Sequence, residues 1–171
     1  MDTAKSILVH GVAHQIQGHN FQSYVEDESF GPWIKSLIRQ FQIDFVFEEA
    51  SGRGPSVVEE LVRSLQKTVS YLDIDPSANE RAKYGIAQRT GDGGPIDPAH
   101  SVDVYEISYV GEQKKREEEW LKRIQGSAFD HGLVICGVAH TLSFAFRLQS
   151  AGLHVINAYT YIPYSKLGMR S

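Results

Sequence analysis

Five short apolar segments recur along the chain, with stretches of helical spacing between them. The apolar segments have the length and composition of buried strands and lie at 7–12, 43–47, 69–73, 133–136 and 153–157. The helical stretches, several of which begin at a proline, lie at 32–41, 55–65, 76–87, 101–125 and 141–149. Strands that alternate with helices favour an α/β fold, a single layered domain in which a central, mainly parallel sheet is flanked by helices.

Length and composition narrow the class of protein. The 171 residues fit one domain, 1–171, whose tail at 159–171 we leave unassigned. The net charge of -4 disfavours nucleic-acid binding by bulk electrostatics, because such proteins usually carry a basic face. A single cysteine excludes an internal disulfide framework. No apolar stretch approaches the ~20 residues of a membrane span, and the first residues lack a secretory signal pattern, so we expect a cytoplasmic protein with no membrane partner.

The tetrapeptide Gly-Val-Ala-His occurs twice, at 11–14 and at 137–140, and each copy closes a predicted strand. Open α/β sheets bind ligands at the carboxyl ends of their strands. A glycine at such an end allows a tight turn or a close backbone approach. We therefore predict that His14 and His140 face each other across one cleft.

Acidic residues follow two of the other predicted strands. Glu48 and Glu49 end the second strand, and Asp73 and Asp75 end the third. Neutral imidazole and carboxylate are the usual ligands of a catalytic divalent metal, and a carboxylate near a histidine can also serve as a general base. Plainer interpretations exist, since strand-end histidines often only hydrogen-bond and one aspartate can cap the next helix. Only one of two adjacent glutamates can face a site, because neighbours on a strand point to opposite faces.

These motifs keep one order over nearly the whole chain. The segments are Gly11-Val12-Ala13-His14, Phe45-Val46-Phe47-Glu48 with Arg53, Leu72-Asp73-Ile74-Asp75 with Arg81, Arg116-Glu117-Glu118-Glu119-Trp120, and Cys136-Gly137-Val138-Ala139-His140. Together they resemble the superfamily that includes TraB/PrgY-type pheromone-shutdown proteins, TIKI Wnt-inactivating proteases, ChaN-like proteins and erythromycin esterases. The chain departs from that pattern at Glu48-Glu49, where the family has one glutamate followed by an apolar residue. We expect Glu48 to face the site, and its spacing to Arg53 favours that choice.

The resemblance implies a centre built from His14, Glu48 and His140, with Arg116 as an anion partner or as the residue that positions the glutamate. Similar proteins differ in their chemistry. TIKI-like members are metal-dependent peptidases, erythromycin esterases resemble hydrolases with a histidine-activated water and no required metal, and ChaN-like members bind haem.

Two hypotheses follow from the resemblance. In the first, the protein is a hydrolase in which His14 and Glu48 activate water to attack an ester or amide of a small-molecule or peptide substrate. One divalent metal, held by His14, Glu48 and His140, is optional, and His140 is either a ligand or an oxyanion stabiliser. The residues expected to bind the substrate are Arg53, Arg116 and Asp73, the arginines at a carboxylate or phosphate.

In the second hypothesis, the same cleft binds a small ligand, haem or a partner protein without turnover. The aromatic-rich tail and the glycine-rich segment 91–95 favour it, since either can cover a large ligand or form the contact of a homodimer.

Overall fold

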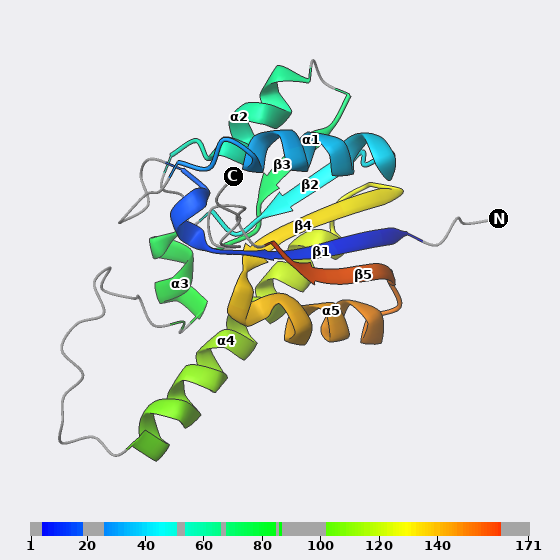
Figure 1. Ribbon diagram of the computed structural model, residues 1–171. Helices are drawn as coiled ribbons and strands as arrows, with labels where there is room; N and C mark the ends of the chain where they lie inside the picture. Colours follow the sequence, from blue (N-terminus) through cyan, green and yellow to red (C-terminus); the bar gives the residue numbers. More distant parts are fainter. Residues whose placement is uncertain are drawn as a thin grey trace.

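The computed structural model describes residues 5–18, 26–50, 54–65, 68–84, 86 and 102–161, and at 78 and 102–112 it describes the backbone alone. Five strands form one sheet in the order β3-β2-β4-β1-β5, and every neighbouring pair is parallel. The strands are β1 (Ser6–Val12), β2 (Phe45–Glu48), β3 (Ser70–Asp73), β4 (His131–Gly137) and β5 (His154–Thr160). The helices are α1 (Phe30–Gln40), α2 (Val57–Ser64), α3 (Ala78–Tyr84), α4 (Val102–Gln125) and α5 (Thr141–Ser150). Helices flank the sheet (Figure 1), and the predicted α/β fold class is confirmed.

Side chains of the central strands alternate between two apolar clusters, one on each face of the sheet. On β1, Leu8 and Val12 pack with α1 and α2, whereas Ile7 and Val9 pack with α4 and α5. Because helices cover both of its faces, β1 is buried along its whole length and appears in the sequence as a continuous apolar run. Strand β3 lies at the edge of the sheet and is less buried, which explains its weaker apolar signal.

The chain leaves β1 and β4, two neighbouring strands inside the sheet, toward opposite faces. After β1 it crosses to β2 through α1 on one face, and after β4 it crosses to β5 through α5 on the other (Figure 1). Neighbouring strands connected in this way leave a crevice at their carboxyl ends, where open α/β sheets bind ligands. Both copies of Gly-Val-Ala-His lie at this crevice, since Val12 pairs with Gly137 in the β1–β4 ladder.

The helices agree with the sequence expectations apart from their ends. Helix α3 ends at Tyr84 rather than near 87, and the chain after β1 begins with a 3₁₀ turn at His14–Ile16. Helix α2 begins directly after Ser56, which caps it because its side chain accepts a hydrogen bond from the Glu59 backbone N–H. Within the described residues, no helix combines the length and apolar character needed to cross a membrane.

Candidate functional site

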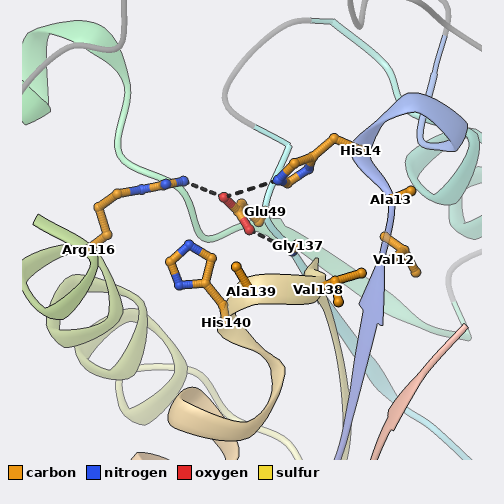
Figure 2. A pocket seen from close by; sticks show the side chains of 9 residues that line it. All are labelled: Val12, Ala13, His14, Glu49, Arg116, Gly137, Val138, Ala139 and His140. Atoms are coloured by element: carbon orange, nitrogen blue, oxygen red, sulfur yellow. Dashed lines mark hydrogen bonds and ion pairs between the residues drawn. The ribbon is translucent and has the colours of Figure 1, made fainter. Parts of the chain in front are cut away.

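The two Gly-Val-Ala-His copies meet at one cavity. Each copy turns out of its strand through a 3₁₀ turn, His14–Ile16 after β1 and Val138–His140 after β4. Between them lies a cavity of about 230 Å³ (Figure 2). Its described lining consists of Val12, Ala13, His14, Glu49, Arg116, Gly137, Val138, Ala139 and His140. The structure therefore brings both motif histidines and one of the two glutamates to the same place.

The glycine of each copy is required by the packing of the other copy. A Cβ at Gly11 would collide with the hydroxyl of Thr141, the residue that follows the second copy. A Cβ at Gly137 would lie 2.6 Å from Nε2 of His14 and 3.3 Å from Oε2 of Glu49. A Cβ at either position would force the neighbouring side chain to move, because backbone and side chains approach closely there.

Glu49, rather than Glu48, is the carboxylate at the cavity, which corrects the expectation from the sequence. Its Oε1 accepts a hydrogen bond from Nη2 of Arg116 and lies 3.7 Å from Nε2 of His14. Its Oε2 accepts a hydrogen bond of 2.8 Å from the backbone N–H of Gly137. In Figure 2 the side chains of Arg116 and His14 point at Glu49 from opposite sides. Glu49 is 2 % exposed, so these partners compensate a buried charge.

The alternation of side chains along β2 sends Glu48 to the other face of the sheet. Phe47 packs with α4 and α5, so Val46 and Glu48 point toward α1 and α2. Glu48 is fully buried and accepts hydrogen bonds from Ser56 Oγ at 2.5 Å and Tyr71 OH at 2.8 Å. Burial raises the pKa of Glu48 to about 7, although these hydrogen bonds act in the opposite direction.

Gln17 is a further buried polar residue of this network and was not singled out from the sequence. Its side-chain nitrogen donates to Glu48 Oε1 at 2.9 Å, and its side-chain oxygen lies 2.6 Å from Nδ1 of His14. Gln17 is fully buried. The signal that could have found it is its place three residues after His14, one turn further along, because residues at this spacing can share a face.

Arg116 of α4 holds Glu49 in place. Its guanidinium donates to Glu49 and also to Asp75, from Nε at 3.2 Å and from Nη2 at 3.0 Å. Burial acts to lower the pKa of Arg116, but the two carboxylates outweigh it and the pKa is raised. Of the two roles expected for Arg116, this geometry matches the positioning of a glutamate. Asp75 is a second buried carboxylate that balances the charge of Arg116. It also accepts hydrogen bonds from Arg81 and from Trp120 Nε1.

His140 also lines the cavity, and its contact with Glu117 fixes the orientation of the ring. Its Nδ1 lies 3.0 Å from Glu117 Oε1, and its ring packs edge-on against Trp120. Glu117 also accepts hydrogen bonds from Ser143 and Arg147. Burial acts to raise the pKa of Glu117, but the contact with His140 and the other hydrogen bonds lower it overall. An ionised Glu117 makes Nδ1 of His140 a donor, so its Nε2 is the atom available for chemistry.

Of the residues expected to bind substrate, Asp73 lies apart from the described lining of the cavity. Its Oδ1 accepts hydrogen bonds from the backbone N–H groups of Ala50 and Asp75. It therefore stabilises the turns that follow β2 and β3. Arg53, the segment 91–95 and the tail beyond 161 lie outside the described residues.

The donors around the cavity do not fit a resident divalent ion. Glu48, expected as a ligand, is on the far face, and both oxygens of Glu49 already accept hydrogen bonds from Arg116 and Gly137. A guanidinium on a carboxylate opposes the binding of a cation by the same oxygens. Over the part of the chain that is described, no group of three or more His, Cys, Asp or Glu side chains is arranged to hold a metal ion.

No protein-family model matches the chain, and no curated protein or solved structure matches it either.

Proposed function

We propose that the protein is a hydrolase in which His14 is the general base and Glu49 its acidic partner. The observation that carries the proposal is that two strand-end histidines line one cavity together with a buried Glu49–Arg116 ion pair. A base, a carboxylate and a second histidine around one small cavity are the components of water-mediated acyl transfer. The order of motifs that resembles the erythromycin esterase and TIKI superfamily supports the same class of reaction.

In this mechanism a water binds between His14 and Glu49. Nε2 of His14 and Oε1 of Glu49 are 3.7 Å apart, close enough for one water to donate a hydrogen bond to each. His14 removes a proton as the water oxygen attacks the carbonyl of an ester or amide. The carboxylate of Glu49 then stabilises the imidazolium that forms, and the hydrogen bond from Arg116 keeps that carboxylate oriented. When the tetrahedral intermediate collapses, the ester C–O or amide C–N bond breaks, and His14 gives the proton to the leaving alcohol or amine.

His140 acts on the other side of the reacting carbonyl. As an imidazolium whose Nδ1 donates to Glu117, His140 donates a hydrogen bond from Nε2 to the oxyanion of the tetrahedral intermediate. The small volume of the cavity suits the reacting group of a substrate, with the rest of a small molecule or peptide outside it. The mechanism routes no step through a metal.

Ligand binding without turnover is the second candidate function, and one surface supports it. Leu142 and Phe146, four residues apart on α5, are 75 % and 72 % exposed, and Val138, which lines the cavity, is 47 % exposed. Residues at this spacing form one stripe on a helix, and exposed apolar stripes are typical of binding surfaces. A haem or an apolar partner at the cavity would use this stripe.

The test is hydrolysis of a panel of chromogenic esters and short peptides by the purified protein. We expect turnover that is lost in His14→Ala and in Glu49→Gln, whereas His154→Ala is the matched control because His154 is an exposed residue of β5. Metal analysis should find no bound divalent ion, and addition of a chelator should leave the hydrolytic activity unchanged. Haemin titration followed by absorbance tests the second candidate, and tight binding of haemin without hydrolysis would contradict the proposal.

A further inference from the structure

Gln17 connects His14 to a carboxylate on the other face of the sheet. Its side-chain nitrogen donates to Glu48 Oε1 at 2.9 Å and to the backbone carbonyl of Glu49 at 3.3 Å. Its side-chain oxygen lies 2.6 Å from Nδ1 of His14. Gln17 is fully buried, so the protein groups around it decide the orientation of its amide.

Only one orientation of this amide satisfies those neighbours. The backbone carbonyl of Glu49 can accept but cannot donate a hydrogen bond, and Glu48 behaves in the same way once it is ionised, above its pKa of about 7. The amide nitrogen of Gln17 must therefore face them, and its carbonyl oxygen must face His14. Because a carbonyl oxygen cannot donate, the hydrogen between Gln17 and His14 belongs to Nδ1 of the imidazole.

We propose that Gln17 and Glu48 hold neutral His14 in the tautomer that carries its hydrogen on Nδ1. The lone pair is then on Nε2, the atom that faces Glu49 across 3.7 Å at the cavity. Gln17 and Glu48 are positioning residues in this scheme, since neither lines the cavity. The inference rests on the proposed function, in which Nε2 of His14 takes the proton from water.

Glu48 is itself held by two elements of the fold. Ser56, the cap of α2, and Tyr71 of β3 both donate to Oε2 of Glu48, which leaves Oε1 directed at Gln17. The acceptor for the Gln17 amide is thus fixed by residues distant from His14 in sequence. The buried carboxyl of Glu48 thus accepts from three donors. It orients the amide of Gln17, and that amide in turn orients the imidazole of His14.

The tautomer is measured directly by NMR on the intact protein labelled with ¹⁵N in its histidines. In a spectrum of the neutral imidazole of His14, we expect long-range ¹H–¹⁵N correlations that place the hydrogen on Nδ1. The His14 signal is assigned by its loss in His14→Gln. A wild-type His14 with its hydrogen on Nε2 would overturn the inference without any variant.

Two variants separate positioning from simple support of the structure. Gln17→Met removes both polar atoms and should convert His14 to a mixture of tautomers. Glu48→Gln is the conservative variant, because its side-chain oxygen still accepts from Gln17, and His14 should keep its hydrogen on Nδ1. His140 is the internal control in each spectrum, since its Nδ1 partner is Glu117. An unchanged His14 pattern in Gln17→Met, with His140 also unchanged, would contradict the proposal.

Kinetics provide the second readout on an ester that the wild-type protein hydrolyses. Gln17→Met should lower kcat by as much as about 10²–10⁴-fold, the contribution of a general base, while KM is retained. Wild-type kcat in Gln17→Met would overturn the positioning role. If no ester or peptide is hydrolysed, the proposed function fails, whereas the tautomer of His14 is still decided by the NMR spectrum.

Discussion

The variants His10→Phe and Glu48→Gln should change the pH dependence of stability in opposite directions. His10 of β1 is 3 % exposed, and within the described residues neither ring nitrogen has a hydrogen-bond partner. It packs against Trp33 and Tyr159, so phenylalanine suits the same space. Burial lowers the pKa of His10 to about 4, whereas burial raises the pKa of Glu48 to about 7.

The sign of each contribution follows from which state binds more protons. Between pH 4 and 6.5 the unfolded chain protonates His10 and the folded protein does not, so this residue makes stability rise with pH. Between pH 4.5 and 7 the folded protein keeps a proton on Glu48 that the unfolded chain has lost, so this residue makes stability fall with pH. At about 1.4 kcal/mol per pH unit, each contribution amounts to about 3 kcal/mol. In the wild-type protein the contributions of His10 and Glu48 to the pH dependence of stability nearly cancel between about pH 4.5 and 6.5.

Urea unfolding across this pH range gives the free energy of unfolding of each protein. The value for the variant minus the value for the wild type removes the contributions of all other groups. The relative stability of His10→Phe should fall by about 3 kcal/mol as pH rises from 4 to 6.5. That of Glu48→Gln should rise by about 3 kcal/mol as pH increases from 4.5 to 7. The double variant should track the wild type between about pH 4.5 and 6.5. Parallel curves for the wild type and either single variant would refute the reasoning.

Two further variants test the geometry of the cavity. Gly137→Ala places a Cβ 2.6 Å from Nε2 of His14 and should lower kcat/KM by about 10²-fold, whereas Gly31→Ala, whose Cβ meets Val57 at 3.9 Å, should keep wild-type hydrolysis. Equal hydrolysis rates for the two would show that His14 tolerates displacement. Arg116→Met leaves Glu49 and Asp75 without their shared cation and should lower the free energy of unfolding by about 3–5 kcal/mol. As the control, Arg63→Met removes an exposed ion pair and should lower the free energy of unfolding by less than about 0.5 kcal/mol. An equally small loss for Arg116→Met in the same urea titration would contradict the stabilising role of the buried ion pair.

The strands and helices of this fold could be predicted because their local patterns are strong. Strand β1 is buried on both faces and is apolar throughout, and the prolines that precede the helices mark where several of them begin. Sheet order is a property of non-local pairing. Nothing in the sequence near His14 or His140 shows that β1 and β4 are neighbours, although the repeated motif suggested that their ends share a site.

The choice between Glu48 and Glu49 shows where sequence reasoning was insufficient. Alternation along β2 was expected, but which face belonged to the cavity depended on where Phe47 packs, and that is fixed by α4 and α5. Gln17 and Glu117 became part of the site only through contacts between segments far apart in sequence. Such contacts have no local signature, since a buried polar residue resembles a surface residue when only its neighbours in sequence are considered.

The central claim, that His14 and His140 act at one site, is tested most directly by a double-mutant cycle on kcat/KM. The measurement compares His14→Ala, His140→Ala and the double variant on one ester. Groups that act as a unit are strongly non-additive, so the double variant should lose little more activity than His14→Ala alone. Losses that multiply, as for independent sites, would contradict the account.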